Sequence, residues 1–361
     1  MVLKAAVISL GSKSSKMVIK AMQKYFKVVD ALNLKDIEVN ITSKGPEVLH
    51  KGQPLEQYDC IYAKGSFRYA PLLRAITNVA SKNSYMPLAP DTFTIGHDKI
   101  LTHLRLQKHS IPMPHTYLSA TSESTKKVLE KINYPIIMKF PSGTQGKGVM
   151  FADSFAAASS MLDALTALRQ PFLIQEYIET GSTDIRAIVV GDKVVAAMQR
   201  TAELGEKRAN IHAGGVGKPY KIDAYMQKVA VGTAKALGAD ICAVDMLESV
   251  KGPVVIEVNI SPGLQGITEA TKIDVAAKIA RFLHQKTGEI VDKKKKSQSA
   301  EIMRELSSNG PKKEIITNLD VRGERILLPA VISNESKLSE KDEVIIKVEK
   351  GKIKIEKLSL K

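Results

Sequence analysis

Tryptophan is absent from this chain of 361 residues, and aromatic residues make up only 5% of it. The two cysteines, Cys60 and Cys242, lie in apolar, strand-like runs without metal-ligating neighbours at useful spacing. We expect two buried free thiols, which suit a reducing, cytoplasmic location. No basic patch with interleaved aromatic residues indicates stacking on nucleic-acid bases, so a nucleic-acid partner is not expected.

Long hydrophobic runs are missing as well. No apolar run reaches the length that spans a membrane, so no membrane partner is expected. The first residues, MVLKAAVISLG, are too short an apolar stretch for a signal peptide and are typical of a first strand. The loop that follows, GSKSSK, lacks the GxGxxG fingerprint, which argues against a nicotinamide site there.

Acidic residues are outnumbered: 53 Lys and Arg face 38 Asp and Glu, a formal net charge of +15. The excess is spread along the chain, with one block at Lys293–Lys296. A lysine-rich solvated surface accounts for this charge. An anionic partner, such as an acidic protein or peptide, is the alternative.

What the chain does contain is a polar pattern inside apolar strands at 241–263, ICAVDMLESVKGPVVIEVNISPG. Alternation places Glu257 and Asn259 on one face of the second strand, and Asp245 lies in the middle of the first. If the two strands pair antiparallel, the three side chains converge. Such oxygen ligands suit Mg²⁺ bound together with phosphates. The alternative is an acidic strand face on the surface.

A second pattern, PIIMKFPSGTQGKGVMF at 135–151, reads as a strand ending in Lys139, a glycine-rich loop and another strand. The loop leads into a strand, so it is not a Walker A loop. Gly143, Gly146 and Gly148 leave the backbone free to approach phosphates. A plain hairpin turn is the alternative; the neighbouring lysine and the acidic strands downstream favour a nucleotide site.

The order of strand and helix signals predicts an α/β and α+β protein of several parts. Residues 1–95 alternate strands and helices, which indicates a small parallel α/β domain. Residues 96–175 read as a compact α+β lid and residues 176–288 as a further unit that contains the polar strands at 241–263. A polar stretch at 289–312 is typical of a linker, and 313–361 read as a small all-β domain whose core is too small to stand alone.

These motifs resemble an ATP-grasp ligase of the RimK type. The resemblance rests on Lys139, GTQGKG, QEYI, Asp184-Ile185-Arg186, Asn210, Asp245 and EVNISPG, in that order, and covers residues 1–288. It implies the ATP-grasp fold, with residues 1–95 as the pre-ATP-grasp domain, 96–175 as the lid subdomain and 176–288 as the catalytic subdomain. The tail, RGERILLPAV…SEKDEVIIKVEKGKIKI, is similar to a swapped-hairpin domain of the AbrB kind. Self-association of this tail would make the protein a homo-oligomer.

The resemblance implies a role for each matching residue. ATP would contact Lys99, Lys139, Gly143, Thr144, Gln145, Gly146, Lys147, Gly148, Glu176, Tyr177, Ile178, Asp184 and Arg208. Catalysis would involve Arg186, Arg200, Arg208 and Asn210, and two Mg²⁺ (or Mn²⁺) ions would be held by Asp245, Glu257 and Asn259. Lys99 also fits an exposed lysine beside a turn, and both Arg186 and Arg200 fit arginines on a strand edge. His212 is more typical of an incidental loop histidine than of a general base.

In function, the resemblance implies an ATP-dependent carboxylate–amine ligase that adds an amino acid, with glutamate favoured, through an acyl phosphate. Relatives act on a ribosomal protein tail, a carrier protein, or pterin and deazaflavin coenzymes, and the acceptor stays open among small molecules and protein tails. Lys207, Ala213 and Thr201 depart from the family pattern on the acceptor side. A nucleotide-responsive regulator that binds DNA through its tail is the alternative; the tail lacks a dense arginine cluster for phosphates.

Overall fold

The computed structural model describes residues 2–141, 148–201, 217–308 and 320–358. The chain divides into two compact units, residues 1–295 and 296–361. In the described part, no helix combines the length and apolar character needed to cross a membrane.

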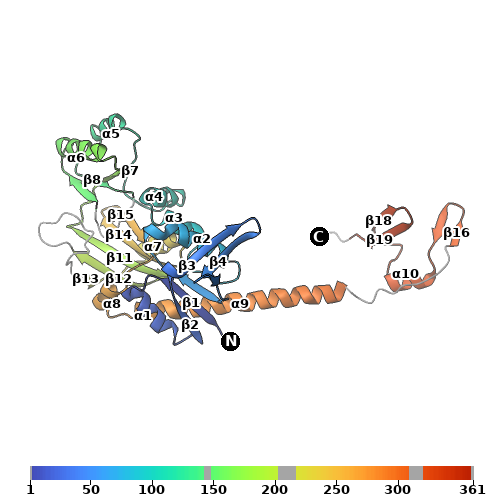
Figure 1. Ribbon diagram of the computed structural model, residues 1–361. Coiled ribbons are helices and arrows are strands. Elements are labelled where there is room, and N and C mark those ends of the chain that lie inside the picture. Colours follow the sequence, from blue (N-terminus) through green and yellow to red (C-terminus); the bar gives the residue numbers. More distant parts are fainter. Residues whose placement is uncertain (1, 142–147, 202–216, 309–319, 359–361) are drawn as a thin grey trace. The chain divides into compact units, whose positions relative to one another are not determined.

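A three-stranded parallel sheet in the order β2-β1-β6 opens the first unit. Figure 1 labels its strands β1 and β2. The central strand β1 is buried along nearly its whole length, as a continuous apolar run in a parallel sheet should be. Residues 37–54 add a small antiparallel sheet that the sequence did not predict. The elements are β1 (Lys4–Ser9), α1 (Lys13–Met22), β2 (Val28–Asn33), β3 (Ile37–Thr42), β4 (Gly45–His50), β5 (Gln53–Pro54), β6 (Cys60–Ala63), α2 (Ala70–Ala80), α3 (Pro90–Ile95) and α4 (Lys99–Lys108).

A four-stranded antiparallel sheet, in the order β7-β10-β8-β9, carries two helices and has its own hydrophobic core around Leu129, Met138 and Leu162. This is the strand–loop–strand against two helices that the sequence predicted. Its elements are β7 (Thr116–Tyr117), α5 (Ser122–Leu129), β8 (Ile136–Lys139), β9 (Val149–Ala152), α6 (Phe155–Ala167) and β10 (Leu173–Glu176).

The third sheet is antiparallel, in the order β13-β12-β11-β14-β15, and shares one core with the first sheet. Two predicted turns are confirmed: a hairpin at Gly191, where φ is +64°, and the hairpin that joins β14 and β15. The predicted caps of α7, Asp223 and Gly238, are confirmed as well. The elements are β11 (Thr183–Val190), β12 (Lys193–Thr201), β13 (Gly217–Pro219), α7 (Ala224–Leu237), β14 (Ile241–Ser249), β15 (Gly252–Asn259), α8 (Gln265–Thr271) and α9 (Val275–Ser308).

In the region predicted to be a linker, 289–312, the helix α9 continues as far as Ser308. Its Lys, Glu, Gln and Ala residues are good helix formers, and the first Gly-Pro pair comes only at 310–311. The tail contains two short hairpins and a helix that begins after Pro329, where a strand was expected. These elements are β16 (Asp320–Arg322), β17 (Arg325–Leu327), α10 (Ala330–Ser336), β18 (Val344–Glu349) and β19 (Lys352–Lys357).

Candidate active site

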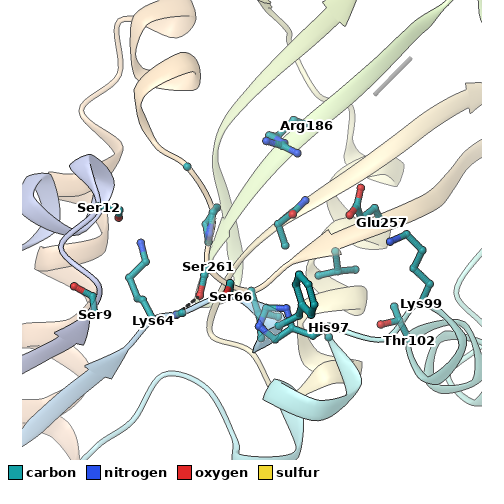
Figure 2. A pocket seen from close by; sticks show the side chains of 18 of the residues that line it. Ser9, Ser12, Lys64, Ser66, His97, Lys99, Thr102, Arg186, Glu257 and Ser261 are labelled. Carbon is teal, nitrogen blue, oxygen red and sulfur yellow. Dashed lines mark hydrogen bonds between the residues drawn. The ribbon is translucent and has the colours of Figure 1, made fainter. Parts of the chain in front are cut away.

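A cavity of about 460 Å³ lies in the first unit, where several elements meet. Its walls come from the end of β1, the residues after β6, the start of α4, and β15 with the loop that follows it. Lys99 and Glu257 lie together on one side of this pocket, with Lys64 and Ser9 across from them (Figure 2). Predicted site residues Lys99, Arg186, Glu257 and Asn259 all line it.

Two aspartates and two arginines form a buried ion-pair network that reaches the cavity wall through Arg186. Arg186 donates through Nε and an Nη to both oxygens of Asp245, at 2.8 and 2.7 Å. Arg200 does the same to Asp184, at 2.6 Å for each bond, and also reaches Asp245 at 3.0 Å. Strand register explains both pairs, since Arg186 lies opposite Asp245 and Arg200 opposite Asp184. Such bidentate pairs depend on the planar guanidinium group, which lysine lacks.

The ion-pair network and its burial shift the pKa values of both aspartates. Burial alone would raise the pKa of Asp245, but Arg186 and Arg200 outweigh it and hold the pKa below its usual range. Burial raises the pKa of Asp184, an effect that Arg200 only partly offsets. The Asp184 side chain is not exposed and does not line the cavity. Contact with an ATP ribose would require its pair with Arg200 to open, and that role stays a prediction.

Glu257 and Asn259 are the members of the predicted metal set that face the cavity. Glu257 lies opposite Asp245 across the hairpin, and a bulge next to this pair shifts the register. Asn259 donates to Asp245 Oδ2 at 3.3 Å, so the convergence expected from the strand pattern is confirmed. Burial raises the pKa of Glu257, Asp245 raises it further, and Lys99 and Lys139 oppose this. These residues offer oxygen atoms as ligands, the type of ligand that Mg²⁺ prefers.

Among the described residues, no three or more His, Cys, Asp or Glu side chains group together as a metal site would. The predicted set has only two carboxylates, and Asp245 is committed to Arg186 and Arg200. Glu257 is therefore the carboxylate of this set that faces the cavity, and the metal role of all three residues stays a prediction.

Lys139 ends β8 with its side chain buried, and its Nζ donates to Gln175 Oε1 at 2.6 Å. Burial lowers its pKa to about 8, with a further contribution from Lys99. Lys99 is the first residue of α4, which Asp98 caps by accepting from the backbone N–H groups of Ile100 and Leu101. Both lysines lower the pKa of Glu257, Lys99 from the cavity wall and Lys139 from β8, outside the lining of the cavity.

Gly148 closes the glycine-rich loop with a φ of +79°, and a Cβ there would lie 2.2 Å from the Phe140 ring. Glycine is therefore required at this position. The other loop residues expected to bind ATP, Gly143, Thr144, Gln145, Gly146 and Lys147, lie outside the described residues, as do Arg208, Asn210 and His212.

The expected adenine hinge follows β10. Glu176 pairs with His115 through two hydrogen bonds, one of them from the Glu176 N–H to the His115 carbonyl at 2.9 Å. The Tyr177 ring packs edge-on against Phe151 at 5.2 Å, and Ile178 is half-buried. The contact of these residues with the base stays a prediction.

Sequence reasoning missed Lys64, His97 and His103, which also line the cavity. Burial lowers the pKa of each histidine to about 4, so both are neutral near pH 7. Lys64 follows the apolar strand β6 and precedes Gly65-Ser66, so it shares with Lys139 the pattern of a lysine at the end of an apolar strand with a glycine nearby. That shared pattern is the signal by which Lys64 could have been found.

Comparison with known proteins agrees with this geometry. The model of the RimK-like ATP-grasp domain matches residues 96–283. A probable alpha-L-glutamate ligase of Thioalkalivibrio sulfidiphilus is 35% identical over 291 residues, which cover 78% of this chain and 96% of that protein. A probable alpha-L-glutamate ligase 1 of Pseudoalteromonas atlantica is 38% identical over 264 residues, 72% of this chain and 86% of that protein.

Solved structures share the fold. A RimK domain ATP-grasp protein of Sphaerobacter thermophilus aligns with a TM-score of 0.60 at 19% identity, over 77% of this chain and 98% of that one. The ATP-grasp ligase PsnB, solved with a precursor variant, Mg and ADP, gives a TM-score of 0.63 at 15% identity, over 79% and 98%. The ATP-grasp fold is thereby confirmed. The chain belongs to the RimK-like ATP-grasp family and is an ATP-dependent ligase that forms carbon–nitrogen bonds.

Proposed function

We propose that this ligase joins the amino group of L-glutamate to a carboxylate of an acceptor, through an acyl phosphate, with release of ADP and phosphate. Relatives with 35–38% identity named probable alpha-L-glutamate ligase support glutamate. They favour a ligase over a DNA-binding regulator. The observation that carries the proposal is the cavity itself, in which Lys99, Arg186 and Glu257 face one space.

In the first step, a carboxylate oxygen of the acceptor attacks the γ-phosphorus of ATP, and ADP leaves. In the second, the glutamate amine attacks the acyl carbon, an amide bond forms, phosphate leaves and the amine loses a proton. Lys139 and Lys99 would hold phosphate oxygens from β8 and α4. Arg186, at the cavity wall, would orient the reacting carboxylate through the guanidinium N–H groups that do not bind Asp245.

Glu257, Asn259 and Asp245 would hold Mg²⁺, with two ions proposed. When bound, Mg²⁺ supplies charge neutralisation for the transferring phosphoryl group. For Asp245 to contribute an oxygen it must share it with Arg186, which donates to both of them in this structure. Such sharing links metal binding to the arginine that faces the substrate.

We further propose that the tail forms homo-oligomers. The β18–β19 hairpin exposes apolar side chains, among them Ile346 at 57% and Val348 at 72%. A second copy would cover them. A cytoplasmic location is proposed too, because the reaction consumes ATP and both cysteines are free thiols.

The test is release of ADP and phosphate from ATP and Mg²⁺ with each of a panel of amino acids and acceptors, followed by product mass. The expected result is glutamate-dependent release and a product heavier by one glutamate residue. Glu257→Gln should abolish turnover with the fold intact, because it removes charge and little volume. Glutamate-independent turnover, or full activity of Glu257→Gln at saturating Mg²⁺, would contradict the proposal.

A further inference from the structure

Lys64 is a buried lysine whose amine has no hydrogen-bond acceptor within the described part of the chain. Its side chain is 4% exposed and lines the cavity. Its backbone N–H is fixed by the Ile8 carbonyl at 2.8 Å. A buried ammonium group without a partner is unfavourable, so such a group points to a bound anion.

No contact within the described part of the chain compensates for the burial of the Lys64 amine. The Tyr62 ring lies 5.3 Å from the Lys64 Nζ, within reach of a cation–π contact. That contact accepts none of the three N–H donors of the amine. Burial also lowers the pKa of Lys64 to about 8, and no acidic residue in the described part of the chain raises it.

The place of Lys64 in the fold is one where α/β sheets bind ligands. In the sheet order β2-β1-β6, β2 and β6 lie on opposite sides of β1. The strand order therefore reverses at β1, and β1 and β6 flank the topological switch point of the sheet. Ligands of such sheets lie beyond the carboxyl ends of the strands at this point. Ser9 ends β1 and Lys64 directly follows β6, so the two line the cavity at that edge.

The surroundings of Lys64 favour a small anion. Ser12, the N-cap of α1, and Ser15 line the same cavity, and the first turn of α1 has no acidic residue. The start of a helix is favourable for negative charge. Among the residues that line the cavity, the carboxylate is Glu257, which lies on the far side beside Lys99 (Figure 2).

Hydrogen bonds also fix the segment that carries Lys64 next to the loop after β15, beside the proposed reaction centre. The N–H of Gly65 donates to Ser261 Oγ at 3.2 Å, two residues after Asn259. Ser14 joins α1 to the same loop, since its Oγ accepts from the Leu264 N–H at 2.9 Å and donates to Gln265 Oε1 at 2.8 Å. A group bound by Lys64 therefore lies at a fixed place relative to β15.

We propose that Lys64, with Ser9 and the start of α1, binds a carboxylate of a substrate that does not itself react, on the side of the cavity opposite Lys99 and Glu257. The inference rests on the proposed function, because both substrates of a glutamate ligase carry such carboxylates. Either the amino acid or the acceptor supplies it. The subsite fixes which carboxylate stays free and thereby sets substrate specificity.

The test compares wild type with Lys64→Met, Lys64→Arg and the matched control Lys20→Met, a change of an exposed lysine in α1. Circular dichroism checks folding, and Lys64→Gln replaces Lys64→Met if that variant does not fold. Calorimetry in the presence of Mg²⁺ and a non-hydrolysable ATP analogue measures binding of L-glutamate, its α-amide, L-glutamine and a glutamyl-glutamate dipeptide as acceptor.

In Lys64→Met, we expect the Kd of L-glutamate or of the dipeptide to rise by about tenfold or more, with partial recovery in Lys64→Arg. The Kd of the ATP analogue should stay within about twofold in every variant. If the Kd rises for L-glutamate but not for its α-amide or for L-glutamine, Lys64 binds the carboxylate that the analogue lacks. If the Kd rises for the dipeptide alone, Lys64 binds a carboxylate of the acceptor.

Three results would overturn the inference: unchanged binding of both carboxylate probes by folded Lys64→Met, a change confined to the ATP analogue or to inorganic phosphate, or no binding of any carboxylate probe to wild type. Binding is measured without turnover. A failed ligase assay with Lys64-dependent probe binding would therefore refute the proposed reaction and leave the subsite standing.

Discussion

Arg200 lies between two buried aspartates, and Arg200→Gln should destabilise the ATP-free protein by about 3–5 kcal/mol, the usual cost of breaking a buried ion pair. The arginine is 6% exposed and both partner side chains are fully buried. Asp245 keeps Arg186 at 2.7 Å, so the loss falls mainly on Asp184. We therefore expect a value near the lower end of this range.

Urea unfolding followed by circular dichroism measures this change as a shift of the midpoint at constant slope. The double variant Asp184→Asn/Arg200→Gln should be more stable than the sum of the single changes predicts, by roughly 0.5–3 kcal/mol, because it leaves no buried charge unpaired. A loss below about 0.5 kcal/mol for Arg200→Gln would refute the reasoning.

The same variants separate two roles for Asp184. If it serves the ion-pair network, Asp184→Asn lowers stability and leaves the KM for ATP unchanged. If it also contacts the ribose, as the resemblance implies, the KM for ATP rises together with the loss of stability.

Three further predictions concern Lys139, Gly148 and the tail. Because burial lowers the pKa of Lys139 to about 8, kcat/KM for ATP should fall as pH rises through about 8. The free energy of unfolding of the ATP-free protein should instead increase between about pH 8 and the ordinary pKa of lysine, because in that range the Lys139 amine is protonated only in the unfolded chain. Lys139→Met should weaken both pH dependences. Gly148→Ala should raise the KM for ATP or lower kcat, because its Cβ would meet Phe140 at 2.2 Å; unchanged kinetics would show that the loop does not approach phosphate. Deleting residues 300–361 should reduce the number of subunits per particle, measured by light scattering, and leave ATP binding intact; the same number of subunits with and without the tail would exclude it as the oligomerisation module.

The parts of the site that the sequence predicted lie in local patterns. Asp245, Glu257 and Asn259 stood out because polar residues interrupt two apolar strands joined by a short turn, and strand pairing then brings them together. Lys139 stood out for the same reason, at the junction of an apolar strand and a glycine-rich loop.

What could not be predicted depends on contacts between distant segments. The pair Arg186–Asp245 joins residues 59 apart in sequence, and the alignment of β11 with β14 that creates it has no local signal. Lys64 meets Ser9 and Ser12 only because β1 and β6 are neighbours in the parallel sheet. The helical structure of the region after residue 289 was not predicted, because its polar composition was read without its helix propensity.

The most direct test of the central claim follows an oxygen atom. An acceptor identified by the panel assay is labelled with ¹⁸O in its reacting carboxylate, then incubated with ATP, Mg²⁺, L-glutamate and the enzyme. An acyl phosphate predicts ADP together with phosphate that contains one ¹⁸O from the acceptor. Unlabelled phosphate, or AMP and pyrophosphate in place of ADP, would contradict the account.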